Sequence, residues 1–354
     1  MKKTIIYLAA AAMFTACSSD IDYTEPDNFT DEITFSVGSI GMPSKIASRA
    51  DEDHTHITWN AAVHANTLGV FGFCEGSTIF DNQKVTYNST GSRWEYSPTK
   101  YWKDYANKNS DFFGYMVEAD ELPLATIETS ETSGTSKYTL SFPASISSPI
   151  LTSADNTPLI CHAPKHTTEK FAIPFEMDQT LTGYCIQFQL GEKMDNIRDF
   201  VIKSVKIYGN NLPTGGTVSR TYTFDGSTWT AGEVKWSVTK SEATHTFTIE
   251  SGPLTVRKDL VQWGDAFFVI PSSNFSPTIE VTYDVVANDD HNADGSTITR
   301  KDVKSTIILN KTNFSNLTTG TTGEINPIKI KIVPDYLYVL SDDDHATGVL
   351  VVGE

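Results

Sequence analysis

The residues that could carry chemistry are scattered along the chain. Only two of its histidine pairs are spaced closely enough to suggest a shared metal ion. His54 and His56 would share a face on a strand, but acidic residues precede them and favour a solvated loop. His162 and His166 have helical spacing, yet Pro164 between them prevents a helix from presenting both. The histidines therefore predict no metal site.

One segment matches the opening of a calcium-binding loop. Oxygen-bearing residues alternate from Asp290, and Gly295 stands sixth. The twelfth position, which should be a bidentate Glu, is Lys301, so a polar hairpin tip is the better interpretation. No nucleophile elbow or phosphate-binding glycine loop is present, and no carboxylate pair stands out. We expect no enzyme, no metal and no cofactor.

A cysteine near the N-terminus predicts a modification. Lys2 and Lys3 precede an apolar stretch to residue 16, which has the length of a signal-peptide core and is too short to span a bilayer. It ends in Phe14-Thr15-Ala16-Cys17, which resembles the lipobox of bacterial lipoproteins, in which the cysteine is lipidated. The alternative is an ordinary secretory signal cleaved nearby. The other three cysteines, in apolar contexts, are expected to be mainly buried free thiols.

Composition limits the possible partners. The chain has 354 residues, 39% of them hydrophobic, and a net charge of −17. This composition is that of a folded protein, and the charge repels phosphate backbones, so nucleic acid is not an expected partner. A lipid on Cys17 would anchor the chain to a membrane surface.

The mature chain predicts strands almost throughout. Apolar and polar residues alternate in many short runs rich in β-branched and aromatic side chains, with turn residues between them. The clearest runs are Ile33–Val37, Lys137–Phe142, Tyr184–Leu190, Val201–Tyr208, Thr246–Ile249, Ile279–Val285 and Ile328–Ile332. Turns are expected at Asn210–Pro213, Gly215–Gly216, Asp225–Gly226 and Asp294–Gly295. This pattern predicts an all-β fold of antiparallel β-sandwiches.

Changes in composition divide the chain. We expect a signal peptide at 1–16, a tether at 17–31, an N-terminal β-sandwich domain at 32–168, a C-terminal β-sandwich domain at 169–332 and a tail at 333–354. The boundary near residue 168 follows an irregular region rich in Ser and Thr, after which strong alternation resumes.

Four blocks occur in order and together cover most of the chain from Ile33 to Ile332. They are Glu32–Phe35 leading to Ser48-Arg49-Ala50; Val70–Phe73 with Lys100–Trp102 and Phe112–Tyr115; Phe171–Phe175 with Gly183–Leu190 and Val201–Tyr208; and Ala266–Pro271 with Ile279–Tyr283. In order and spacing these blocks resemble the fimbrillin-like proteins, or type V pilins, of Bacteroidales.

The resemblance implies two tandem transthyretin-like domains and export as a lipoprotein to the outer membrane. It also implies assembly into fimbriae with other subunits, and a role in adhesion to host or bacterial surface receptors. In that scheme an Arg-specific protease cuts after Arg49, before Ala50, and removes the N-terminal strand at 32–49. The tail of the next subunit then fills the groove that opens.

The residues are compatible with that scheme. Ile33, Phe35 and Val37 form an amphipathic strand whose removal would leave an apolar trough and unpaired backbone groups, which recruit another strand. The tail offers large apolar side chains at alternate positions, namely Tyr336, Tyr338, Leu340, Leu350 and Val352. The tail could instead form the last strand of its own chain.

A second function is a glycan-binding surface lipoprotein. Aromatic rings stack on sugars, and the best cluster for this is Trp94, Tyr96, Tyr101 and Trp102. The alternative role for these side chains is packing within a sandwich core.

Overall fold

The computed structural model describes residues 31–41, 57–59, 67–105, 108–132, 134–153, 157–167, 172–190, 198–272, 275–291, 297–310, 314, 322–323, 325–334 and 348–353. In these residues the regular structure is strands and one 3-10 turn, η1 (Trp102–Asp104), which confirms the all-β prediction. None of their helical structure is long and apolar enough to cross a membrane.

The described strands form three sheets. The nine-stranded sheet has the order β2-β1-β11-β9-β6-β3-β4-β5, with β10 beside β6. Its strands are β1 (Phe35–Gly41), β2 (Ile57–Trp59), β3 (Thr67–Cys74), β4 (Ser77–Asn88), β5 (Arg93–Glu95), β6 (Ser110–Val117), β9 (Leu159–Cys161), β10 (Lys165–Thr167) and β11 (Ile173–Gln179).

The other two sheets contain most of the later strands. The four-stranded sheet has the order β17 (Val261–Val269), β12 (Thr182–Leu190), β20 (Ile325–Pro334) and β21 (Gly348–Gly353). The eight-stranded sheet has the order β19 (Thr297–Ile308), β18 (Thr278–His291), β13 (Arg198–Phe224), β8 (Thr135–Ser145) and β7 (Thr126–Thr132). Its strands β14 (Trp229–Ala231), β15 (Lys235–Ile249) and β16 (Leu254–Val256) also pair with β13.

Two large cores lie against opposite halves of the long strand β13. One packs Phe112 and Tyr115 of the nine-stranded sheet with Val218 and Tyr222 of β13. The other includes side chains of the four-stranded sheet, together with Phe200, Ile207 and other residues of β13 and β18. Alternation of apolar and polar residues places one face of each strand in a core, as expected for half-buried strands.

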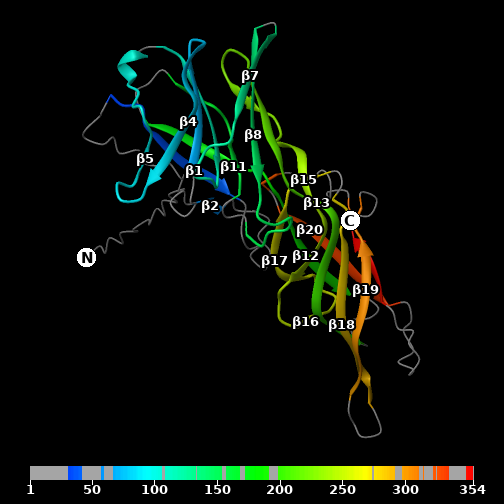
Figure 1. Cartoon of the computed structure of the whole chain (residues 1–354). Coiled ribbons are helices and arrows are strands. Elements are labelled where there is room, and N and C mark those ends of the chain that lie inside the picture. The colour runs from blue at the N-terminus through cyan, green and yellow to red at the C-terminus, as the bar shows by residue number, and fades with distance from the viewer. Residues whose placement is uncertain are drawn as a thin grey trace, which may run out of the picture.

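β13 connects the two cores. Its first half pairs with β18 on one edge, from Arg198 to Tyr208, and its second half pairs with β8 on that edge, from Gly215 to Phe224. On the other edge β15 pairs with β13 across both halves. Figure 1 shows β7 and β8 toward one end of the molecule and the hairpin β18–β19 toward the other, with β13 and β15 between.

The sheets are mainly antiparallel, as predicted, but two pairs are parallel. β1 runs parallel to β11, and β12 runs parallel to β20. The prediction assumed that parallel neighbours need a helical crossover. Here the partners are far apart in sequence, and intervening strands make the connection.

One set of predicted turns is wrong. Asn210–Pro213 and Gly215–Gly216 lie within β13, where bulges beside β15 absorb the irregular residues. The turn at Asp225–Gly226 is confirmed: Gly226 has a φ of +97°, and the Asp225 carboxylate accepts hydrogen bonds from the backbone N–H groups of Thr228 and Ser227, which lower the pKa of Asp225. Asp294–Gly295 lies outside the described residues, between paired His291 and Thr297.

The sheets extend across the boundary expected at residue 168. β11 follows that boundary, yet it pairs with β1 and β9, which precede it. β13 joins both cores in the same way. The division into domains at 32–168 and 169–332 therefore stays a prediction, and strands from both segments build the sheet around β1.

Gly216 is predicted to be essential for the close approach of β15 to β13. A Cβ atom at this position would overlap the carbonyl oxygen of Ser237 on the backbone of β15. Gly216→Ala should lower the free energy of unfolding by about 1–3 kcal/mol, the range for overpacking. Urea unfolding followed by tryptophan fluorescence measures it. Gly252→Ala is the control, because a Cβ there meets nothing within 4 Å, and an equal loss in both variants would contradict the prediction.

Candidate functional site

The first strand, β1, is the candidate functional site because it lies beside the edge of its sheet. β11 is its long neighbour and pairs in parallel from Phe35–Ile173 to Ile40–Asp178. Its other described strand neighbour is the three-residue β2, which pairs only with Ser39–Gly41. Among the described residues, most of β1 thus has a strand on one edge alone.

Side chains of β1, and that of Ile33 just before it, nevertheless belong to the core. Ile33 and Phe35 are 0% and 5% exposed, and Val37 is half-buried against the same cluster. Thr34 and Ser36 between them point to the other face and are partly exposed. The alternation of apolar and polar residues at 33–37 therefore predicted correctly which side chains face the core.

Phe35 occupies an aromatic pocket. Its ring centroid lies 5.5 Å from those of Phe80 and Tyr96 in edge-to-face geometry, and 6.1 Å from the stacked ring of Phe175. Gly114 keeps the backbone of β6 close to Phe175, since a Cβ there would lie 3.2 Å from the ring. Two strands, β4 and β11, and the segment after β5 thus build one pocket for one side chain, and β6 packs against Phe175.

The residues just before β1 have hydrogen-bonding partners on both edges. The N–H of Ile33 donates to the Lys100 carbonyl at 2.9 Å, and the N–H of Trp102 donates to the Asp31 carbonyl at 2.6 Å. On the opposite edge, the N–H of Ile173 donates to the Thr34 carbonyl at 2.8 Å. We call the space that β1 fills, bounded by β11 and by Tyr96 with residues 100–103, the β1 groove.

Tyr96 contributes a hydroxyl to the groove. It donates to the Ile33 carbonyl at 2.7 Å, and the N–H of Lys100 donates to its oxygen at 3.2 Å. Burial, the largest cause, raises the pKa of Tyr96 to about 12. The hydroxyl therefore keeps its proton at neutral pH and can serve as a donor.

A buried polar network holds β11, the other wall of the groove, in place. Arg220 of β13 donates from Nη1 to Asp178 Oδ2 at 2.6 Å and to the Cys161 carbonyl at 3.1 Å. The Tyr222 hydroxyl donates to the same carbonyl at 2.6 Å. These bonds join β9, β11 and β13 without involving β1, so the end of β11 at Asp178 is held by contacts other than those with β1.

The predicted site residues are described only in part. Cys17, Arg49, Ala50, Tyr336, Tyr338 and Leu340 lie outside the described residues. Leu350 and Val352 lie in β21, where they pair with Ile332 and Ile330 of β20 in the same chain. The tail strand thus takes the intramolecular alternative at its end. Asp31, assigned to the tether, accepts a hydrogen bond from the N–H of Lys103 at its Oδ2, 3.0 Å away.

The remaining candidates for chemistry have structural partners. Cys74, Cys161 and Cys185 are buried free thiols, as predicted. His162 contacts Asp178 and His166 contacts Asp111, at 2.9 and 2.7 Å, so the two histidines have separate partners. The described residues contain no group of three or more His, Cys, Asp or Glu side chains placed to hold a metal ion.

The aromatic cluster proposed for glycan binding is largely internal. Trp94 and Trp102 are 8% and 2% exposed, and the Tyr96 ring packs on Phe35 and Phe80. Only Tyr101, at 42%, is well exposed. The alternative of core packing is therefore the correct one for this cluster, and it presents no flat aromatic platform to a sugar.

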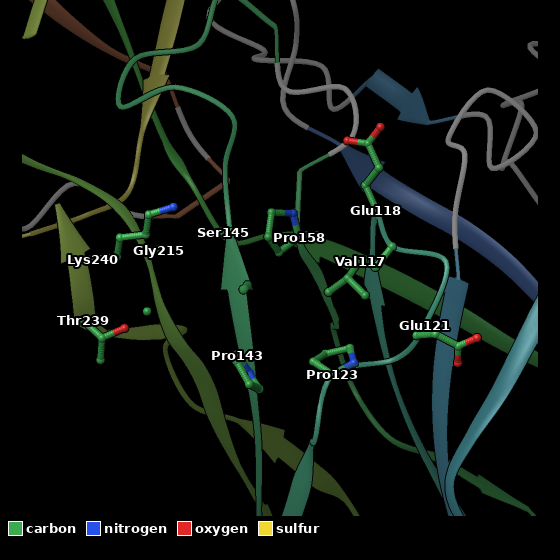
Figure 2. A pocket seen from close by; sticks show the side chains of 13 residues that line it. Val117, Glu118, Glu121, Pro123, Pro143, Ser145, Pro158, Gly215, Thr239 and Lys240 are labelled. Atoms are coloured by element: carbon green, nitrogen blue, oxygen red, sulfur yellow. The ribbon is translucent and has the colours of Figure 1, made fainter. Parts of the chain in front are cut away.

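A hollow of about 360 Å³ lies where β6, β8, β13 and β15 approach one another. It is lined by Val117, Glu118, Ala119, Glu121, Pro123, Pro143, Ala144, Ser145, Pro158, Gly215, Gly216, Thr239 and Lys240. Figure 2 shows the carboxylates of Glu118 and Glu121 on one side and the Lys240 side chain on the other. Its polar groups do not converge, so it lacks the arrangement that orients a ligand.

Comparisons with known proteins give structures of low similarity. No family model matches the chain, and no curated protein matches it. A "putative cell adhesion protein" from Bacteroides ovatus is 12% identical with a TM-score of 0.38, over 91% of this chain and 95% of that one. A fimbrial protein from Bacteroides ovatus is 12% identical with a TM-score of 0.33, over 92% and 54%. The major pilin from Streptococcus pyogenes is 9% identical with a TM-score of 0.20, over 85% and 96%.

Phe35→Ala should destabilise the intact chain strongly. The substitution empties the pocket formed by Phe80, Tyr96 and Phe175, and a buried Phe→Ala change costs about 3–5 kcal/mol. Urea unfolding measures the free energy. Leu124→Ala, at a side chain that is 85% exposed, should change it by less than about 0.5 kcal/mol. A Phe35→Ala variant as stable as the Leu124→Ala variant would show that β1 is not part of the core.

Proposed function

We propose that this chain is a structural subunit of fimbriae attached to the outer membrane. It polymerises by strand exchange after proteolytic removal of its N-terminal strand, and the fimbriae act in adhesion. The observation that carries the proposal is the position of β1. Its side chains complete a core, while its backbone lies beside the edge of a sheet with one long partner.

Removal of β1 would leave a groove suited to another strand. Loss of Ile33 and Phe35 would expose Phe80, Phe175 and the ring of Tyr96, and would leave hydrogen-bonding groups of β11 without partners. Burial of each large apolar side chain stabilises by about 1.5–3 kcal/mol, so an incoming strand that fills both positions regains several kcal/mol. An open edge that also has an apolar trough favours strand addition.

The proposed donor is the tail of a second subunit. Tyr336, Tyr338 and Leu340 repeat the spacing of Ile33, Phe35 and Val37 and offer aromatic rings for the Phe35 pocket. Leu350 and Val352 are the other proposed donor residues. They lie in β21, an edge strand whose neighbour in the described sheet is β20, so their donation requires β21 to leave that strand.

Arg49 is the proposed processing position. The other five arginines are in structured parts of the chain: Arg93, Arg198, Arg220 and Arg300 lie in paired strands, and Arg257 forms an ion pair with Asp199 at 3.0 Å. A protease must bind its substrate as an extended single segment, so arginines held in a sheet are poor substrates. A lipid on Cys17 would attach the unprocessed chain to the outer membrane.

A disulfide across β1 and β11 tests the proposal. Ser36 and Pro174 are register partners, both half-buried, and Pro174 has no N–H to lose on substitution. Residues 18–354 should give SDS-resistant ladders on unheated gels after treatment with an arginine-specific protease. The oxidised Ser36→Cys/Pro174→Cys variant should remain monomeric after the same cleavage, because the disulfide retains β1, and should polymerise when reduced.

Two controls accompany this experiment. Arg49→Gln should remain uncut and monomeric, and the single variant Ser36→Cys should polymerise like the parent chain. Ladders from the oxidised double variant, or from Arg49→Gln, would show that assembly does not need the release of β1, and the proposal would be wrong.

A further inference from the structure

The segment at residues 31–41 has two parts that differ in their hydrogen bonds, namely residues 31–34 and β1 itself. From residue 35 onward the strand pairs with β11, and it meets β2 only at Ser39–Gly41. At residues 31–34 the backbone is bonded on both edges, to Ile173 on one side and to Lys100 and Trp102 on the other. A strand with partners on both edges is harder to remove than one with a single free edge.

Side chains reinforce this doubly bonded part. The Asp31 carboxylate accepts from the N–H of Lys103 at 3.0 Å, and the Tyr96 hydroxyl donates to the Ile33 carbonyl at 2.7 Å. Glu32 and Tyr101 form an isolated antiparallel bridge between the same segments. Hydrogen bonds to a charged group contribute more than neutral ones, so Asp31 is a substantial part of the attachment.

We infer that Tyr96 and residues 100–103 form a second wall of the β1 groove. This wall retains β1 after the chain is cut. It then forms hydrogen bonds with the replacing strand, which comes from a second copy of this chain. This inference rests on the strand exchange proposed above. A cut after Arg49 gives the segment that contains β1 a free C-terminal end. Separation of β1 from β11 therefore begins at that end, and residues 31–34 leave last. The second wall therefore sets the rate at which a cut subunit becomes ready to polymerise.

Asp31 and Tyr96, which both form hydrogen bonds across this interface, have different fates after the cut. Asp31 belongs to the segment that leaves, so a polymer made from an Asp31 variant is chemically identical to one made from the parent chain. Tyr96 stays in the groove, where its hydroxyl can donate to a carbonyl of the incoming strand as it does to Ile33. The two residues therefore separate the retention of β1 from the binding of its replacement.

The experiment makes two measurements on residues 18–354 with a labelled N-terminus. Size-exclusion chromatography follows the release of the N-terminal fragment after cleavage. The dissociation of finished polymers is then followed in urea. Asp31→Ala should release the fragment about tenfold faster and shorten the delay before polymerisation, with unchanged polymers. Tyr96→Phe should release it about fivefold faster and give polymers that dissociate about fivefold faster.

Matched controls make the same chemical changes outside these bonds. Ser36→Ala lies in β1 on its outward face, and Tyr208→Phe removes a hydroxyl from a partly exposed ring of β13, which is not part of the groove. Both should behave like the parent chain in release and in polymer stability. A release rate unchanged by Asp31→Ala would overturn the retaining role. Polymers of Tyr96→Phe as stable as those of the parent would overturn the binding role.

The proposed function and this inference can fail separately. If the parent chain releases its fragment and forms no polymer, strand exchange is wrong, while the release rates of Asp31→Ala and Tyr96→Phe still measure retention. If the parent chain polymerises and both variants match it at every step, strand exchange stands and the second wall is wrong.

Discussion

The fit of Phe35 into a pocket formed by Phe80, Tyr96 and Phe175 is the interaction on which the rest of this structure depends. It places an N-terminal segment in the core of a sheet, beside β11, which follows more than a hundred positions later in the chain. A core packed to normal density cannot lose such a ring without exposing the pocket walls. The chain therefore needs some strand in this position, whether it is its own or another's, and the β1 groove can be considered as a binding site that the chain itself fills.

One end of β11, which forms a wall of that site, is held by bonds that do not involve β1. Arg220 and Tyr222 fix β9 and β11 through hydrogen bonds and burial, and burial also raises the pKa of Tyr222 well above its ordinary value, so its hydroxyl stays protonated. A wall that is anchored at one end without its occupant has less to reorder when a strand binds, which lowers the entropic cost of binding. The Arg220–Asp178 ion pair therefore fixes the position of β11 beside the groove, whereas its net contribution to the free energy of unfolding is expected to be small.

Local pattern predicted the strands better than their partners. Alternation at Ile33–Val37 and Val201–Tyr208 correctly indicated strands and their buried faces, because the period of a strand is visible in a few residues. It could not indicate that β1 lies parallel to β11, since that pairing joins residues more than a hundred positions apart. The second wall at residues 100–103 was missed for a related reason: its contacts use backbone groups, which leave no mark in the sequence. Asn210–Pro213 and Gly215–Gly216 suggested turns, whereas these residues lie within β13, which has bulges at Pro213–Gly216 and a close approach of β15 at Gly216.

The continuity of β13 has a mechanical consequence. Both cores are attached to this one strand, and β15 follows it from one core into the other. A force along the strand axis would act on all the hydrogen bonds between β13 and β15 at once, in shear. In a protein whose two cores were joined only by a flexible hinge, these bonds would instead break one at a time. A protein that shares tension in this way resists extension until many bonds break together, a property suited to the links of a filament under drag.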